Sequence, residues 1–163
     1  MKDTKKVYES LDKLENLIKV LVVNPGKDPE LTLIRDALKV HQEIVGGSLE
    51  QVTLPDNIVM LFNEEGKMIG LPFNRMLPKE YFDGDDIVCG TIILTEINDN
   101  GEFKSLSDGQ VKKCMDLFAW EKNKKDVNEW IVKFLAEKES DIEQLKATYP
   151  DGKNGWNWED YEI

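Results

Sequence analysis

The fold is decided by residues 17–30, which read LIKVLVVNPGKDPE. The first seven residues are rich in β-branched side chains, which predicts a strand buried on both faces. Asn24-Pro25-Gly26 ends this strand with residues that favour turns. Asp28 is a good helix N-cap, Pro29 suits the first helical position and Glu30 suits the first turn. The stretch therefore predicts a strand–turn–helix unit.

The predicted helix runs from Asp28 to Val45, because apolar side chains and one histidine recur at helical spacing. These positions are Leu31, Ile34, Leu38, His41 and Val45. Gly46-Gly47 follows the last of them and is a typical helix stop. The helix is expected to cross over and cover one face of a sheet.

Further strands are predicted from alternating or continuous apolar runs. They span residues 48–54, 58–62, 67–71 and 87–94. Asn63-Glu64-Glu65-Gly66 is interpreted as a four-residue hairpin loop between the second and third of these. Residues 73–77, between two prolines, are expected to be irregular.

Helices are predicted at both ends of the chain. Residues 4–16 have apolar positions at helical spacing, and Ser107 or Asp108 is expected to cap a short helix. A longer helix is expected over about 126–148, where Asp126 and Glu129 resemble a capping box. The fold class is therefore α+β, with a mostly antiparallel sheet of about four to five strands, a crossover helix after strand 1 and C-terminal helices packed on it.

This pattern gives four predicted parts. They are an N-terminal helix (1–16), an α+β core domain (17–97), a C-terminal helical extension packed on the core (98–148) and an aromatic acidic tail (149–163). The tail carries Trp156, Trp158 and Tyr161, which either dock on a partner or fold back onto their own domain.

The amino-acid composition narrows the classes of partner and site that are expected. The 163 residues carry a net charge of −11, which disfavours nucleic acid and anionic membranes as direct partners. We expect a cytoplasmic protein, since no apolar run suits a membrane span or a signal peptide. Cys89 and Cys114 are expected to be reduced core thiols. One histidine and two arginines in the whole chain suggest no catalytic residue, metal site or cofactor.

Two places stand out as candidate ligand-binding sites. Asn24, Gly26 and Lys27 lie at the predicted helix N-terminus, where free N–H groups attract an anion; the alternative is a plain structural turn. Asn74 and Arg75 lie in a proline-bracketed loop, where the guanidinium suits a carboxylate or phosphate. The alternative is that Arg75 pairs with an internal acid such as Glu64 or Glu65.

Three weaker candidates complete the set. Gly90-Thr91 interrupts an apolar strand, which indicates either close approach of a ligand or tight packing. His41 lies on the apolar side of its helix and is interpreted as a buried histidine rather than a base. Asp83, Asp85 and Asp86 lack calcium-loop spacing and are interpreted as a solvated turn.

Several short motifs occur in order: residues 18–26, Gly46-Gly47, residues 63–67, residues 71–75 and Gly90-Thr91. In this order the chain resembles a family of uncharacterised domains found in phages, plasmids and their bacterial hosts, over about residues 17–96. The resemblance implies an accessory product of a mobile element that acts by binding, with counter-defence as one role.

Three hypotheses follow. The first is a non-enzymatic protein that sequesters a small anionic, nucleotide-type ligand through Asn24, Gly26, Lys27, Asn74, Arg75, Gly90 and Thr91. The second is an acidic inhibitor of a host protein, as a DNA mimic or enzyme blocker. The third is a small nucleotide hydrolase. A homo-oligomer stays open in each case.

Overall fold

The computed structural model describes residues 16–148. The chain divides into two compact units, residues 1–127 and 128–163. The predicted helix over 4–16 and the aromatic tail over 149–163 lie outside the described residues. Each unit is considered by itself below.

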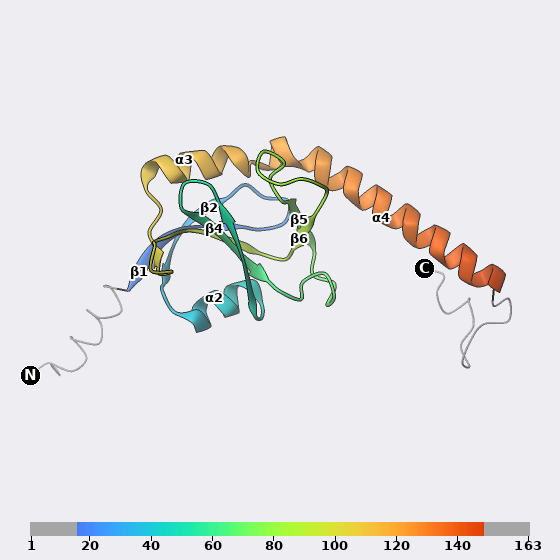
Figure 1. The fold of residues 1–163 in the computed structure, drawn as a ribbon, viewed down its shortest axis with the longest axis horizontal. Coiled ribbons are helices and arrows are strands. Elements are labelled where there is room, and N and C mark those ends of the chain that lie inside the picture. The colour runs from blue at the N-terminus through green and yellow to red at the C-terminus, as the bar shows by residue number, and fades with distance from the viewer. Residues whose placement is uncertain (1–15, 149–163) are drawn as a thin grey trace, which may run out of the picture. The chain divides into compact units, whose positions relative to one another are not determined.

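The first unit is built on an antiparallel sheet in the order β2-β1-β7-β4-β3, with β8 paired to β7 (Figure 1). A separate two-stranded sheet pairs β5 with β6. The strand bounds are β1 Leu17–Val23, β2 Glu30–Arg35, β3 Leu49–Leu54, β4 Ile58–Asn63, β5 Phe73–Met76, β6 Ile87–Cys89, β7 Ile92–Ile97 and β8 Phe103–Lys104. The helices are α2 Leu38–Val45, α3 Asp108–Leu117 and α4 Trp120–Thr148. The predicted α+β class with a mostly antiparallel sheet is confirmed.

The two faces of the main sheet bury separate apolar clusters, because successive side chains of a strand point to opposite faces. Leu21 and Leu94 face the cluster that α3 covers through Cys114 and Leu117. Ile93 belongs to the opposite cluster, which α2 covers. Figure 1 shows the two helices on opposite sides of the sheet. Cys89 and Cys114 are buried and unpaired, as predicted.

The prediction of a helix beginning at Asp28 was wrong. Residues 30–35 form β2, which pairs with β1 from Leu17↔Arg35 to Val22↔Glu30. Gly26 adopts a φ of +73°, so Asn24-Pro25-Gly26 closes a hairpin instead of opening a helix. The apolar spacing was misleading because Leu31 is 50% exposed and Leu33 is 65% exposed. The helix follows strand 2 and covers only 38–45.

Three further local predictions were wrong. Residues 67–70 form turns instead of a strand, and the Ile69 N–H donates to the Glu65 carbonyl at 3.0 Å. The segment expected to be irregular contains β5. The predicted strand 87–94 is two strands, because Gly90 turns the chain with a φ of +86° and sends β6 and β7 into different sheets.

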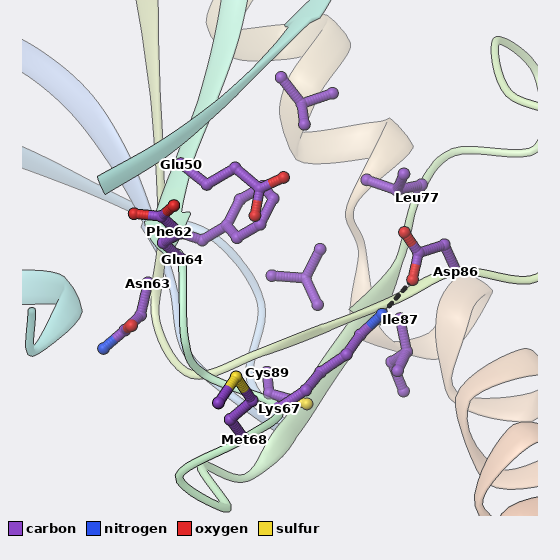
Figure 2. A pocket seen from close by; sticks show the side chains of 12 residues that line it. Glu50, Phe62, Asn63, Glu64, Lys67, Met68, Leu77, Asp86, Ile87 and Cys89 are labelled. Atoms are coloured by element: carbon purple, nitrogen blue, oxygen red, sulfur yellow. Dashed lines mark hydrogen bonds and ion pairs between the residues drawn. The ribbon is translucent and has the colours of Figure 1, made fainter. Parts of the chain in front are cut away.

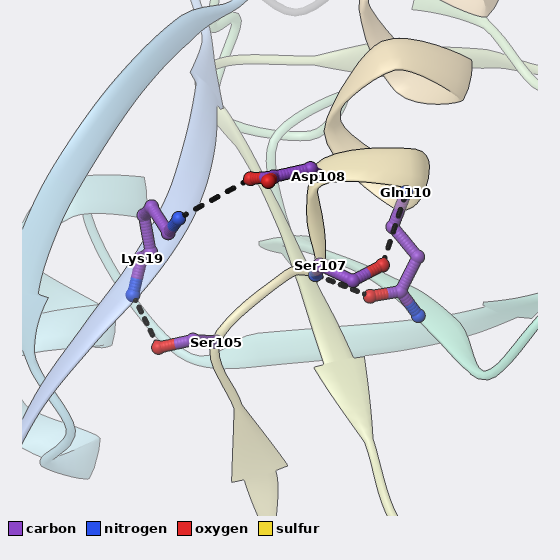
Figure 3. A network of polar contacts seen from close by, with 5 residues as sticks. All are labelled: Lys19, Ser105, Ser107, Asp108 and Gln110. Atoms are coloured by element: carbon purple, nitrogen blue, oxygen red, sulfur yellow. Dashed lines mark hydrogen bonds and ion pairs between the residues drawn. The ribbon is translucent and has the colours of Figure 1, made fainter.

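The start of α3 agrees with the cap predicted from the sequence, because Ser107 is its N-cap. The Ser107 hydroxyl accepts from the Gln110 N–H at 3.2 Å, and the Gln110 side chain accepts from the Ser107 N–H at 2.8 Å, forming a capping box. Lys19 of β1 pairs with Asp108 at 3.7 Å, and its N–H donates to the Ser105 hydroxyl at 2.9 Å (Figure 3). The capping box fixes where α3 begins, and the Lys19 N–H joins the segment before α3 to β1.

The capping box predicted at Asp126 and Glu129 was wrong, since α4 already begins at Trp120. Its first turns belong to the first unit, where Val127 is buried. In the second unit the rings of Trp130 and Phe134 stack with centroids 5.2 Å apart. Within residues 16–148, no helix is long and apolar enough to cross a membrane.

Candidate functional site

The seven residues predicted to bind a ligand lie close together in the folded chain. They come from three segments that are far apart in sequence: the β1–β2 turn, β5, and the connection between β6 and β7. These segments contribute Asn24, Gly26 and Lys27; Asn74 and Arg75; and Gly90 and Thr91, respectively. Their polar groups bond mainly to one another and to nearby backbone.

Arg75 is fully buried, and its five N–H groups have five acceptor contacts. Nε and Nη2 donate to the Phe118 carbonyl at 3.2 and 3.0 Å. Nη1 donates to the Asn74 carbonyl and to Asn74 Oδ1 at 3.4 and 3.0 Å. Nη2 also donates to the Lys27 carbonyl. The guanidinium therefore ties the β1–β2 turn to the end of α3.

An aromatic ring and a carboxylate complete the surroundings of Arg75. Its guanidinium carbon lies 4.8 Å from the centroid of the Trp120 ring, which favours the cation. Burial lowers the pKa of Arg75 to about 10, while the Asp28 carboxylate raises it. The side chain therefore stays charged at neutral pH. Asp28 also accepts from the Trp120 N–H at 2.9 Å.

The side chains of Asn74 and Thr91 also form hydrogen bonds to other groups of the protein. The Asn74 amide nitrogen donates to the carbonyls of Val23 and Gly90, both at 2.8 Å. The Thr91 hydroxyl donates to Asn24 Oδ1 at 2.9 Å. These bonds join β1, β5 and the β6–β7 connection. The side-chain donors of Asn74, Arg75 and Thr91 thus point at protein carbonyls and at the amide oxygens of Asn24 and Asn74.

A pocket lies elsewhere on the first unit, between β3, β4, the 64–71 turn and β6 (Figure 2). Its cavity volume is about 330 Å³, which falls at the lower end of the range of small-molecule sites. The lining residues are Glu50, Val52, Phe62, Asn63, Glu64, Lys67, Met68, Leu77, Asp86, Ile87, Val88 and Cys89.

The floor of the pocket is apolar. Phe62, Ile87 and Val88 are 8%, 1% and 4% exposed, so they form a buried base for whatever enters. Cys89 is also buried there, and burial raises the pKa of its thiol, with Lys67 opposing and Asp86 reinforcing the shift. The thiol is therefore protonated at neutral pH and adds to the apolar surface.

The rim of the pocket is charged. Lys67 donates to Asp86 across one side, and Glu50 and Glu64 lie on the other side (Figure 2). All four side chains belong to exposed residues. Among the described residues, neither Glu50 nor Glu64 forms an ion pair. Three carboxylates and one ammonium give the rim a formal charge of −2.

The back wall is held by Asn63 and two glycines. The Asn63 amide donates to the Val45 carbonyl at 3.4 Å and accepts from the Glu65 N–H at 2.8 Å. A Cβ on Gly47 would lie 2.9 Å from the Asn63 amide nitrogen, and a Cβ on Gly66 would lie 2.7 Å from the Cys89 carbonyl oxygen. Position 66 therefore requires glycine, because the contact is with backbone, whereas a side chain at position 47 would displace the Asn63 amide.

Sequence reasoning did not identify this pocket. It treated Glu64 as a loop residue and a possible partner for Arg75, Lys67 as part of a strand and of a family motif, and Asp86 as part of a solvated turn. Glu50 carried no signal, because a single charged residue on an exposed strand is common. Within residues 16–148, no group of three or more His, Cys, Asp or Glu side chains is placed to hold a metal ion.

The same geometry explains the motifs that suggested a family. Asn63 and Gly66 shape the pocket wall, while Asn74, Arg75 and Thr91 hold three segments together. A search of curated proteins and a search of solved structures each found no match to this chain. A family model does match, over residues 18–119, which extends beyond the predicted range to include α3. The chain therefore belongs to the DUF3846 family, a domain of unknown function.

Proposed function

We propose that this protein acts by non-covalent binding, and that its pocket holds a cationic group carried on an apolar body. The observation that carries the proposal is the pairing of an apolar floor with an acidic rim. The floor offers Phe62, Ile87 and Val88, and the rim offers Glu50 and Glu64 without ion-pair partners among the described residues. A butyl-sized stem with an ammonium or guanidinium head matches both features.

The charge of the rim favours a cation over an anion. Lys67 is the lining cation, and it already pairs with Asp86. A carboxylate or phosphate entering the pocket would meet Glu50 and Glu64, whereas a guanidinium or ammonium would pair with them. The net charge of −11 supports the same preference at longer range.

The anionic, nucleotide-type ligand expected from the sequence receives less support from the geometry. That hypothesis needed free donors at the Lys27 turn and at Arg75. The Arg75 donors are directed at the carbonyls of Lys27, Asn74 and Phe118 and at the Asn74 side chain. The turn also closes a hairpin, so it offers no helix N-terminus to an anion.

The proposal keeps the biological setting that the resemblance implied. A small acidic protein of a phage or plasmid that acts by binding would suit a counter-defence role in the host cytoplasm. The acidic-inhibitor hypothesis fits the pocket well, because lysine and arginine side chains of a host protein have the required chemistry. No catalytic step is proposed, since the pocket joins carboxylates only with a protonated thiol and a paired lysine.

The test is a titration with two small molecules of the same shape, butylguanidinium and butylurea, followed by NMR of the ¹⁵N-labelled protein. Butylguanidinium is expected to shift the amide signals of residues 62–68 and 86–89, while butylurea leaves them unchanged. Glu50→Gln and Glu64→Gln should each weaken binding by up to about fivefold, corresponding to about 1 kcal/mol for a partly exposed ion pair.

Glu43→Gln is the matched control, because Glu43 is exposed on α2 away from the pocket lining. It should bind butylguanidinium like the wild type. ADP-ribose and cyclic nucleotides form the opposing arm of the experiment. Binding of a nucleotide at these amides, with no effect of either glutamine variant, would overturn the proposal.

A further inference from the structure

Two apolar side chains stand exposed beside the pocket. Met68 is 87% exposed and Ile69 is 56% exposed, and they are neighbours on the 64–71 turn. Met68 also lines the pocket (Figure 2). Adjacent exposed apolar residues next to a charged cavity indicate a contact surface more than a solvated loop.

The turn that presents them is held in place by backbone contacts. The Ile69 N–H donates to the Glu65 carbonyl at 3.0 Å, and the Leu71 N–H donates to the Gly66 carbonyl at 2.9 Å. Gly66 packs so closely that a Cβ there would lie 2.7 Å from the Cys89 carbonyl oxygen. Met68 and Ile69 are therefore exposed by a defined backbone conformation, which lowers the entropy cost of contacting a partner.

We infer that the pocket and the Met68-Ile69 turn together form a docking surface for a protein segment that carries an arginine or lysine two residues away from an apolar side chain. This inference rests on the proposed function. The basic side chain enters the pocket, where its head pairs with Glu50 and Glu64. The apolar side chain covers Met68 and Ile69.

The size of the cavity and the charge of its rim favour a basic peptide segment as the occupant. A free small cation would fill the cavity of about 330 Å³ without covering the exposed pair beside it. A peptide segment does both, because side chains two residues apart in an extended chain point to the same face and lie about 7 Å apart. The acidic rim complements a basic segment and opposes a phosphate backbone or an anionic lipid surface. Methionine also adapts its shape to different apolar partners.

The experiment uses four seven-residue peptides with blocked ends. The central residue is arginine or its neutral isostere citrulline, and the flanking positions two residues before and after it are leucine or serine. Each is titrated into the full-length protein and followed by NMR. Leucine-flanked arginine is expected to bind about five- to tenfold more tightly than serine-flanked arginine, because it buries extra apolar surface.

The Met68→Ser/Ile69→Ser double variant should lose this preference for leucine flanks and still bind butylguanidinium as the wild type does. Leu31→Ser/Leu33→Ser is the matched control, since both leucines are exposed on β2; it should keep the preference. Unfolding midpoints in urea verify that both double variants remain folded.

The outcomes separate the two proposals. Equal binding of leucine- and serine-flanked arginine, an unchanged preference in the Met68/Ile69 variant, or binding of butylguanidinium but of none of the peptides would each overturn the docking surface alone. Equal binding of the arginine and citrulline peptides, with no response to butylguanidinium, would instead overturn the cationic pocket.

Discussion

At the scale of single residues, Arg75 is a candidate ligand contact whose guanidinium bonds to other parts of the protein. Its guanidinium reaches the β1–β2 turn through Lys27 and the end of α3 through Phe118. A lysine at this position would keep the charge but could not span both carbonyls, because an ammonium presents its donors from one atom. The role of Arg75 therefore depends on the planar shape of the guanidinium as well as on its charge.

We predict that Arg75→Lys lowers the free energy of unfolding by about 3 kcal/mol, since buried hydrogen bonds from a charged group are lost. Urea denaturation followed by circular dichroism measures the change. Arg35→Lys is the control, because Arg35 is exposed on β2, and it should cost less than about 0.5 kcal/mol. Equal midpoints for wild type and Arg75→Lys would show that the observed bonds do not stabilise the fold.

At the scale of elements, the sequence predicts those parts whose signals are local. β1 is a continuous β-branched run, Gly46 ends α2 with a φ of +82°, and Ser107 caps α3. Each depends on neighbouring residues only. β2 depends instead on pairing with β1, and this pairing outweighs the helix-start signal of Asp28-Pro29-Glu30.

The same difference between local signals and tertiary contacts applies to the candidate site. The sequence indicated Asn74, Arg75 and Gly90-Thr91 as unusual residues. Arg75 bonds to Lys27 of the β1–β2 turn, Thr91 bonds to Asn24, and Asn74 bonds to Gly90. It could not show that their donors end on protein carbonyls, because Val23 and Phe118 are brought to them by tertiary structure. The pocket was missed for a similar reason, since its rim comes from three separate segments.

Helix α2 carries a buried titratable group, His41, on the face of the sheet that this helix covers. His41 is 1% exposed, and its ring lies edge-on to Phe103 of β8 with centroids 5.3 Å apart. Neither ring nitrogen has a hydrogen-bond partner among the described residues. Burial lowers the pKa of His41, and the Asp36 carboxylate, 3.7 Å from Nε2, raises it in part.

Because the folded pKa is lowered, the unfolded chain takes up a proton first as the pH falls below about 6.5. The wild type should therefore lose stability between pH 7.5 and 5.5, with a slope of at most about 1.4 kcal/mol per pH unit from this group. His41→Phe removes the titration and should flatten the curve. Urea midpoints across this range test it, and parallel curves for the two proteins would contradict the assignment.

At the scale of the whole molecule, the dominant property is the net charge of −11. Like charges spread over one fold repel one another and destabilise the compact state, and salt screens this repulsion with a Debye length of about 10 Å at 0.1 M. The same field attracts a cationic partner to the pocket. Salt should therefore act in opposite directions on folding and on binding.

We predict that raising NaCl from 0.02 to 0.3 M increases the melting temperature of the free protein by a few degrees and weakens binding of the leucine-flanked arginine peptide several-fold. A triple variant changes three exposed acidic residues outside the pocket lining: Glu43→Gln/Asp99→Asn/Asp116→Asn. It takes the formal net charge from −11 to −8. Its melting temperature should depend less steeply on salt, while its peptide affinity at 0.3 M should match the wild type. If salt lowers the melting temperature, self-repulsion is not what limits the stability of this fold. If affinity does not fall with salt, the acidic rim does not drive recognition, and the apolar floor with the Met68-Ile69 turn must supply it.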